Sequence, residues 1–302
     1  MIIFIYATLI FLVLRFSVTL FNFLSNPKLG HYGKHFNEKV SVVVFGGNDG
    51  EEMFADKIKS QDYVNLEILI QKPGEEMGDV VARSTGKYLL FLKGDVTIYP
   101  GLINNLIYRM KVYHLDQISL VPNRIMNKAV DFLVDPLKDF VLFNVFPLRL
   151  VRLVDMPFWF VNQQPCVFAD SDRYKTIQDA EYEGKIKMEL LQGNKFVNQQ
   201  GQAGLKETGA SVLGILGGNL FTGLVYLSLV IIGPIVMAIN FEPVFLALPV
   251  GLIFLTRVMI AFLTGQHPVK TILFHPLQMG MLVVILIKGM LQALPKTVGD
   301  KN

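Results

Sequence analysis

The sequence has little cysteine, no histidine pattern typical of metal binding and little net charge. Its one cysteine, Cys166, excludes an internal disulfide and any metal site built from cysteines. The five histidines have no metal-ligand spacing on a common helix, so we interpret them as turn, surface or packed residues. A net charge of +3 is too small for a nucleic-acid-binding surface, and no nucleic-acid partner is expected.

Charged residues are also scarce. They make up 18% of the chain, while 52% of residues are hydrophobic and the mean hydropathy is +0.43. A soluble domain carries about a quarter charged residues. The apolar excess is concentrated in residues 1–24 and from about residue 209 to residue 294. This distribution predicts an integral, multi-pass membrane protein in contact with the lipid bilayer.

The first apolar segment, residues 1–24, is long enough to cross a bilayer core of about 30 Å. The alternative, a cleaved signal peptide, requires a basic n-region and a cleavage site of small residues. The sequence has neither, and Arg15 and Asn22 interrupt the apolar run. We therefore expect an uncleaved anchor helix.

The C-terminal region predicts three further membrane helices, near residues 221–239, 244–264 and 271–293. Arg257 and Lys288 lie inside two of them. Charged side chains in such helices face the bundle interior, snorkel to the interface or mark a function. For Lys288 we favour snorkelling.

The basic residues give the orientation. Apart from the amino terminus, no basic residue precedes the first span, whereas Arg15 lies in its second half and Lys28 and Lys34 follow it. The positive-inside rule then places residues 25–205 in the cytoplasm. Three further spans would leave the tail outside, which Lys296 and Lys301 oppose. One C-terminal segment is therefore a candidate re-entrant or interfacial helix, and the side of the C-terminus stays open.

The middle of the chain alternates strand and helix patterns. A β-branched run predicts a buried parallel strand at residues 40–45, and apolar runs predict strands at 66–70 and 88–92, with helices at 51–60 and 75–84. This alternation predicts a parallel sheet covered on both faces. Ligands bind such sheets beyond the carboxyl ends of the strands. Three polar segments fall there and predict a binding cleft: residues 46–49, 71–72 and 93–95.

Three segments of this region carry a family pattern: Val40 to Asp49, Gln61 to Ile68 and Ala82 to Leu92. They resemble family 2 glycosyltransferases, and most of all the membrane-anchored branch related to carotenoid and other lipid glycosyltransferases. Weaker motifs extend the resemblance over nearly the whole chain, including the arrangement of spans. The resemblance implies a GT-A-like α/β domain with a mostly parallel sheet that binds a nucleotide-sugar.

The hydropathy pattern and the resemblance together predict the layout of the chain. It comprises a transmembrane anchor (1–24), a linker (25–38), a cytoplasmic GT-A-like domain (39–205), an interfacial segment (206–220), three transmembrane or membrane-embedded helices (221–294) and a tail (295–302). Within the domain, the apolar run from Phe140 to Arg149 has the bulk of an interfacial helix. A core helix is the alternative.

The resemblance implies that a divalent cation, Mg²⁺ or Mn²⁺, neutralises the leaving diphosphate. In the family an Asp-x-Asp motif after the third strand holds this ion. Here Lys93 occupies the first aspartate position, and Asp95 remains as the one candidate metal ligand. The alternatives are a cation held by Asp95 with phosphates and waters, no metal cofactor, or a simple solvated turn.

The resemblance also implies which residues contact the nucleotide-sugar. The aspartate that contacts the base in the family is replaced by Gln71 and Lys72. The full set of candidate substrate-binding residues is Gly47, Asn48, Asp49, Gln71, Lys72, Lys93, Asp95, Asn162, Gln163 and Gln164.

The family's general base is the aspartate of a Glu-Asp pair that opens a helix, expected here over residues 186–191. Glu183 matches the glutamate of the pair, and Gly184 replaces the aspartate. The remaining catalytic candidates are Glu183 and Asp179, either of which must come within about 2.6–3.2 Å of the acceptor hydroxyl.

Two functions follow. The first is a membrane-bound, non-processive hexosyltransferase that moves a sugar from a nucleotide donor to a lipid-type acceptor. Lys93, with Lys72, would then neutralise the leaving diphosphate directly. The second is a pseudo-glycosyltransferase that serves as a scaffold or partner subunit in a lipid or envelope pathway. The Gln-x-x-Arg-Trp motif of polymerising relatives is absent, which argues against processive synthesis.

Overall fold

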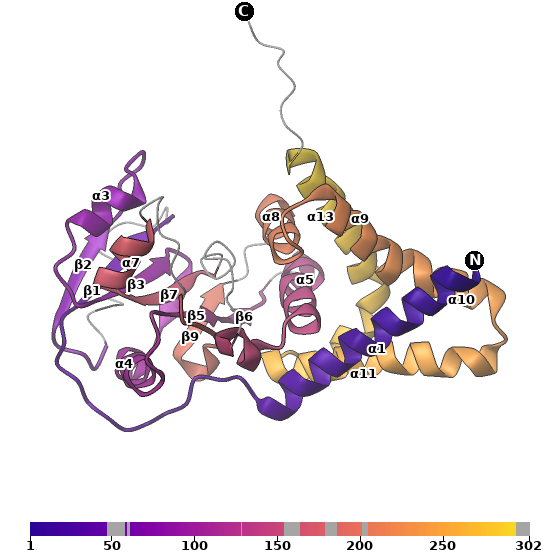
Figure 1. Ribbon diagram of the computed structural model, residues 1–302, viewed down its shortest axis with the longest axis horizontal. Coiled ribbons are helices and arrows are strands. Elements are labelled where there is room, and N and C mark those ends of the chain that lie inside the picture. Colours follow the sequence, from indigo (N-terminus) through magenta and orange to yellow (C-terminus); the bar gives the residue numbers. More distant parts are fainter. Residues whose placement is uncertain are drawn as a thin grey trace, which may run out of the picture. The chain divides into compact units, whose positions relative to one another are not determined.

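The computed structural model of the chain describes residues 1–46, 58, 61–127, 129–153, 164–178, 186–200 and 205–293 (Figure 1). The chain forms two compact units. Unit 1 contains the long apolar helices and comprises Met1–Asn26, Met126–Pro147 and Gly201–Asn302. Unit 2 contains the strands and comprises Pro27–Ile125 and Leu148–Gln200.

Unit 2 is built on a six-stranded sheet in the order β2-β1-β3-β7-β5-β8. β1 pairs in parallel with β2 and β3, and β5 pairs in parallel with β8. β7 is antiparallel to both of its neighbours, β3 and β5. The fold is therefore α/β with a mostly parallel sheet, as expected. The strands are β1 (Val40–Phe45), β2 (Leu66–Ile70), β3 (Tyr88–Lys93), β5 (Gln117–Val121), β7 (Cys166–Asp170) and β8 (Met188–Gln192).

Alternate residues of a strand point to opposite faces of a sheet. Apolar side chains therefore lie on both faces of this sheet, and helices cover both. Val42 of β1 and Leu90 of β3 belong to a core that includes Leu102 and Leu106 of α4 (Leu102–Tyr113). Val43 of β1 belongs to a second core, which includes residues of α3 (Met77–Ala82) and α7 (Ser171–Gln178). In Figure 1, α3 and α7 lie on one side of the sheet and α4 on the other. Double-sided burial explains why these strands read as continuous apolar runs.

A second, three-stranded sheet has the order β4-β9-β6. β9 (Val197–Gln200) is antiparallel to β4 (Val96–Ile98) and parallel to β6 (Asn123–Ile125). The short helices η1 (Leu148–Leu153) and η2 (Asn194–Phe196) complete the described part of unit 2. Only Gly94 and Asp95 separate β3 from β4, so the small sheet begins next to the carboxyl end of the central strands.

The expectation of a helix over residues 186–191 is wrong, because Met188–Gln192 is strand β8. Its Glu189 is fully buried and accepts two hydrogen bonds from Arg109 of α4, at 2.5 and 2.6 Å. Burial alone would lower the pKa of Arg109, but the hydrogen bonds and charge of Glu189 raise it above its ordinary value. Pairing with β5 and with Arg109 therefore outweighs the local helix propensity of this segment.

Unit 1 is a helical bundle. Three of its helices are long and apolar enough to cross a membrane: Ile2–Ser25, Leu220–Asn240 and Pro243–Thr264. The first is α1, the second joins α9 (Leu220–Leu227), a π-helical turn (Ser228–Ile232) and α10 (Gly233–Asn240), and the third is α11. The other helices are α5 (Ala129–Val145), α8 (Leu205–Ile215), α12 (Pro268–Leu273) and α13 (His275–Ala293).

The fourth expected span, residues 271–293, is not one helix. It is interrupted at Phe274, between α12 and α13, and the apolar stretch of α13, His275–Leu291, is shorter than the three spanning helices. The expected interfacial segment 206–220 contains α8, whose Val212 and Leu213 are buried.

Helix α1 turns its polar residues towards the bundle. Thr8, Arg15, Thr19 and Asn22 are buried on one stripe, whereas several of its large apolar residues, such as Ile3, Ile10 and Leu14, are exposed. The Asn22 Nδ2 donates hydrogen bonds to the backbone oxygens of Phe143 and Phe146, at 2.9 and 2.8 Å. This arrangement is typical of membrane helices, in which buried polar groups join helices.

The run from Phe140 to Arg149 does not form the interfacial helix that was one of its two expected roles. Phe140 and Phe143 lie on α5, are 2% and 0% exposed, and belong to the helical unit. Residues 126–147 therefore depart from the expected 39–205 boundary, because α5 packs its apolar side chains against α1, α8, α11 and α13 instead of a lipid surface.

Candidate functional site

The carboxyl ends of β2, β1 and β3 lie at one edge of the large sheet. The register pairs Val44 with Ile70 and Phe45 with Lys93, so the three strands end at the same level. The backbone continues this alignment past the strands: the Gln71 N–H donates to the Val44 carbonyl at 2.9 Å, and the Gly94 N–H donates to the Phe45 carbonyl at 2.8 Å. Gly46 takes a φ of +64°, which glycine adopts readily and which lets the chain turn at this edge.

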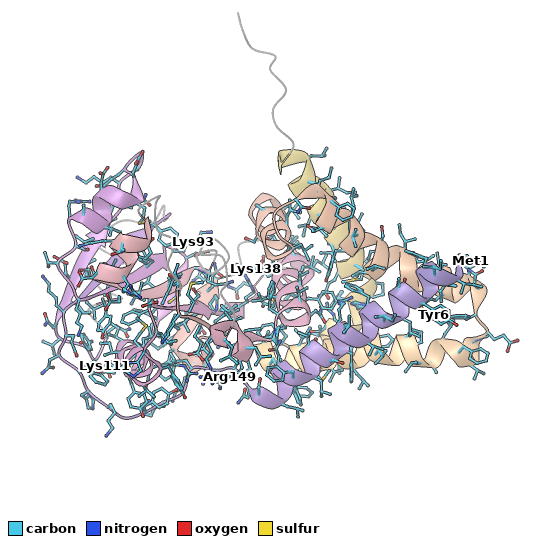
Figure 2. All side chains as sticks on the ribbon, viewed as in Figure 1. Met1, Tyr6, Lys93, Lys111, Lys138 and Arg149 are labelled. Carbon is cyan, nitrogen blue, oxygen red and sulfur yellow. The ribbon has the colours of Figure 1, made fainter. Side chains whose placement is uncertain are left out.

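Lys93 and Asp95 form the charged part of this edge. Lys93 ends β3 and is marked in Figure 2. Its Nζ lies 3.9 Å from Asp95 Oδ2, and the side chains of Lys93 and Asp95 are 25% and 5% exposed. The Lys93 side chain is thus partly exposed, whereas the Asp95 side chain is nearly buried. Asp95 Oδ1 is buried and has no hydrogen-bond partner among the described residues.

Gln199 of β9 orients the Asp95 carboxylate. Its Nε2 donates to Asp95 Oδ2 at 2.9 Å, and its Oε1 accepts a hydrogen bond from Arg124 Nη1 at 3.5 Å. Because β9 lies between β4 and β6, Gln199 connects Asp95, next to β4, with Arg124 on β6. The result is a continuous polar chain from Lys93 to Arg124.

Gln199 and Arg124 were not among the residues expected from sequence. Gln199 is 104 residues from Asp95 along the chain, and its strand carries no motif. The sequence Val197–Gln200 has one apolar residue followed by three polar ones, so no apolar–polar alternation marks it as a strand or as part of a site.

The antiparallel strand β7 brings Gln164 to the same edge. Cys166 pairs with Leu92, and the Lys93 N–H donates to the Pro165 carbonyl at 2.8 Å. Gln164 is 3% exposed, and its Oε1 has no hydrogen-bond partner among the described residues. Cys166 itself is fully buried, which raises the pKa of its thiol well above the ordinary value, so it is a packed neutral residue.

Gln71 and Lys72 lie at the end of β2, separated from β3 by β1. Gln71 Nε2 donates to the Glu75 carbonyl at 2.8 Å, and the Lys72 N–H donates to Glu75 Oε2 at 3.0 Å. Arg83 also binds Glu75, at 2.6 Å. The side-chain amide of Gln71 is therefore used in its own turn, and the structure does not bring Gln71 or Lys72 next to Lys93.

Several candidates lie outside the described residues. They are the nucleotide-binding candidates Gly47, Asn48, Asp49, Asn162 and Gln163 and the catalytic candidates Asp179 and Glu183. Their roles stay predictions. The expected helix at 51–60 also falls largely in this part of the chain.

The residues at this edge do not by themselves fit a protein-held divalent cation. No group of three histidine, cysteine or carboxylate side chains with metal-binding geometry occurs in the part of the chain that the structure describes. Asp95 supplies one buried oxygen without a hydrogen-bond partner among the described residues, and the Lys93 ammonium lies beside its other oxygen. Hard cations are held by several oxygen ligands, so no catalytic step is derived through a metal.

Comparisons with known proteins give structural neighbours only. No family model matches the sequence, and no curated protein matches it. A mannosyltransferase from Pyrobaculum calidifontis, solved with GDP-Man and Mn²⁺, is 11% identical, with a TM-score of 0.49, and the match covers 95% of this chain and 99% of that one. S. aureus TarS 1–349, solved with UDP-GlcNAc, is 9% identical, with a TM-score of 0.39 and coverage of 84% and 90%. Similarity at this level assigns no residue and no reaction to this chain.

Proposed function

We propose that this protein is a membrane-bound, non-processive glycosyltransferase that transfers a sugar from a nucleotide donor to a lipid-type acceptor. Three features support the proposal: the motif resemblance in β1 and β3, the polar edge at the ends of these strands, and the apolar helices on the same chain. Ligands bind α/β sheets at this edge.

The observation that carries the proposal is the unequal exposure of the Lys93–Asp95 pair. In sugar transfer, the bond from the anomeric carbon to the diphosphate breaks, and its electron pair leaves with the diphosphate. Lys93 would neutralise that charge, because its side chain is partly exposed at the strand end and carries the positive charge beside Asp95, whose carboxylate Gln199 holds. The acceptor hydroxyl forms the new bond and gives its proton to a carboxylate, for which we propose Glu183 or Asp179.

Binding of nucleotide-sugars to the purified full-length protein tests this role. We expect saturable binding of one donor class, and we expect Lys93→Ala to lower the rate of transfer about 100-fold or more, as loss of one transition-state donor commonly does. Asp95→Ala should abolish sugar transfer altogether. Lys87→Ala is the matched control, because Lys87 precedes β3 at the opposite end of the strand. Unchanged transfer in both edge variants would refute the assignment.

Titration with Mn²⁺ or Mg²⁺ in the same assay tests the cofactor. Direct neutralisation by Lys93 predicts donor binding without a divalent cation. Binding that depends strictly on the cation would instead support a metal ion held by Asp95 together with the phosphates of the donor.

A second function, a pseudo-glycosyltransferase that acts as a scaffold or partner subunit, is favoured by one observation. A lysine stands at the metal-ligand position, paired with the remaining aspartate. Complementation of a deletion strain separates the two functions. A scaffold predicts full complementation by Lys93→Ala and Asp95→Ala and loss of function on truncation of the membrane helices.

We place unit 2 in the cytoplasm, as the basic residues after α1 indicate. The native cysteine is buried, so it gives little background in thiol labelling. A new cysteine at exposed Lys175 on α7 should resist membrane-impermeant thiol reagents in intact cells and react after lysis. Labelling in intact cells would contradict both functions, because nucleotide-sugars are cytoplasmic.

A further inference from the structure

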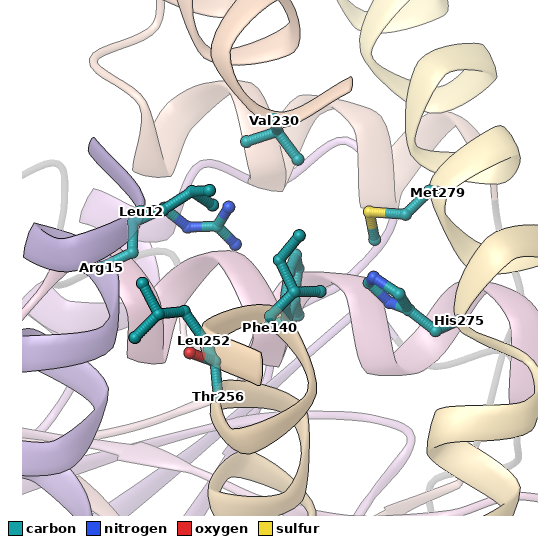
Figure 3. A pocket seen from close by; sticks show the side chains of 9 residues that line it. Leu12, Arg15, Phe140, Val230, Leu252, Thr256, His275 and Met279 are labelled. Atoms are coloured by element: carbon teal, nitrogen blue, oxygen red, sulfur yellow. The ribbon is translucent and has the colours of Figure 1, made fainter. Parts of the chain in front are cut away.

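The cavity beside the buried Arg15 is too small for a lipid head group. Arg15 of α1 and His275 of α13 point into it from different helices, and Phe140 lies between them (Figure 3). Its volume is about 20 Å³, which is room for about one water molecule. The basic residues that can meet a lipid head group therefore lie on the surface, near the ends of the spanning helices.

The carboxyl ends of α1 and α5 mark one border of the membrane. The 24 residues of α1 rise about 36 Å, which exceeds the hydrocarbon core of about 30 Å, so the ends of α1 reach the head groups. In its last turn, Asn22 donates hydrogen bonds to the carbonyls of Phe143 and Phe146, at the carboxyl end of α5. The two helices therefore end at the same level.

Two chain segments leave this border, and both run to β8. Lys28 comes three residues after the end of α1, and its backbone bridges Gln192 of β8. The helix η1 starts three residues after the end of α5, and its Arg149 lies 3.9 Å from Glu189 of β8. An extended chain covers at most about 3.6 Å per residue, so both segments begin within about 11 Å of a helix end. The covalent chain thus keeps η1 and Lys28 close to the head groups.

Exposed apolar and basic side chains cover η1 and the last turn of α4. Leu150 and Leu153 of η1 are 38% and 73% exposed, and Val112 and Tyr113 of α4 are 48% and 41% exposed. The exposed Arg152 connects the two elements, because its guanidinium carbon lies 4.9 Å from the centre of the Tyr113 ring. We call these five residues the η1 patch. Apolar side chains beside an aromatic ring and an arginine are typical of segments that lie in the head-group region.

The charge around the η1 patch is positive among the described residues. None of their ion pairs includes Arg152. Arg149 shares Glu189 with Arg109, so two arginines face one carboxylate. Lys195 is exposed on η2, three residues after the end of β8. An apolar patch with positive charge around it fits an anionic lipid surface, because each basic residue near such a surface adds attraction.

We propose that the η1 patch docks on the anionic lipid surface of the membrane that the helices of the same chain cross. Leu150 and Leu153 enter the head-group boundary. Arg152 binds lipid phosphates, because its planar guanidinium donates to phosphate oxygens in pairs. The docking needs no nucleotide-sugar and no transfer, so it does not depend on the proposed function.

Fluorescence of the full-length protein in lipid vesicles tests the docking. An environment-sensitive dye is attached to Leu153→Cys, and a spin label on the lipid head groups quenches it on contact. The vesicles contain phosphatidylcholine alone or an equimolar mixture with phosphatidylglycerol. The native Cys166 is buried and does not compete for the dye. We expect strong quenching in the anionic vesicles and little quenching of the same dye on Lys175→Cys of α7, which lies on the opposite face of the sheet from α4 (Figure 1).

The charge of Arg152 gives the expected size of the effect. Arg152→Gln should lower the ratio of docked to undocked protein about fivefold in the anionic vesicles, because one basic residue near an anionic surface contributes about that factor. Lys175→Gln is the matched control, since it removes the same charge from an exposed position on α7 and should dock like the wild type. High salt should weaken the docking of the wild type.

Three results would overturn the proposal. They are equal quenching of the dyes at positions 153 and 175, equal quenching in both kinds of vesicle, and unchanged docking in Arg152→Gln. Protection of the dye that disappears when the protein is diluted into more lipid would show that a second copy of the chain covers the patch instead. If the dye at Leu153 disturbs η1, the same dye on Val112→Cys carries the test with the same expected results.

Discussion

The buried ion pair between α4 and β8 gives a prediction whose size follows from the structure. Arg109 and Glu189 are 3% and 0% exposed, and a second arginine, Arg149, lies 3.9 Å from Glu189 Oε1. Removing one partner of a buried pair leaves an uncompensated charge and costs about 3–5 kcal/mol. Arg149 makes the two removals unequal.

Arg109→Met leaves Glu189 facing Arg149, so part of its charge stays compensated. Glu189→Leu leaves two arginines facing each other with no carboxylate between them. Burial, and then the charge of Arg109, already lower the pKa of Arg149 in the intact protein. We therefore expect Glu189→Leu to cost about 5 kcal/mol of unfolding free energy and Arg109→Met about 3 kcal/mol. The double variant should lie within about 2 kcal/mol of the wild type, because apolar replacement of a whole buried pair is often neutral.

Cys166 supplies the assay. It is the only cysteine, it is fully buried in β7, and β7 pairs with β5, the neighbour of β8. Its reaction with a thiol reagent at increasing denaturant therefore reports opening of this sheet and not of the helical unit. Equal losses of unfolding free energy in Glu189→Leu and Arg109→Met would refute the role of Arg149. Costs below about 1 kcal/mol for both would refute the buried pair itself.

Two further predictions concern packing and pH. Gly209 of α8 faces α13 so closely that an added Cβ would lie 2.7 Å from the Ile285 carbonyl oxygen, whereas a Cβ at Gly251 of α11 would meet nothing within 4 Å. Gly209→Ala should therefore destabilise the helical unit by about 1–3 kcal/mol in thermal unfolding, and Gly251→Ala should not; equal behaviour would contradict the close α8–α13 packing. At the amino-terminal end of the sheet, burial alone would raise the pKa of Glu67, but hydrogen bonds from Ser41 and Thr85 and the charge of Lys39 lower it to about 2. Because the pKa of Glu67 is lower in the folded state than its unfolded value of about 4.3, the ionised carboxylate stabilises the fold above that pH. About 1 kcal/mol of unfolding free energy should therefore be lost as the pH falls from 5 towards 2. Glu67→Gln should remove that acid-dependent part in denaturation experiments, and an unchanged pH profile would refute it.

The sequence alone determined the elements that depend on local pattern. Mostly apolar runs predicted β1, β2 and β3, because the strands of a sheet covered on both faces carry few polar side chains. Long apolar runs predicted the spans of α1, α9–α10 and α11. Since parallel strands end at a common edge, the sequence also placed Lys93 and Asp95 where the structure has them.

Only the tertiary structure decided the features that join distant segments. Glu189 lies 80 residues from Arg109, and their contact makes a strand of a segment whose local pattern favours a helix. The phenylalanines of α5 suit a lipid surface as well as a core, and packing against other helices selected the core. Gln199 reaches Asp95 only through the pairing of β4 with β9. From the sequence, Arg257 was a single charge in an apolar helix. Its burial beside Arg15 arises only when α1, α5 and α11 pack together. The free energy of such contacts depends on neighbours that no local pattern specifies.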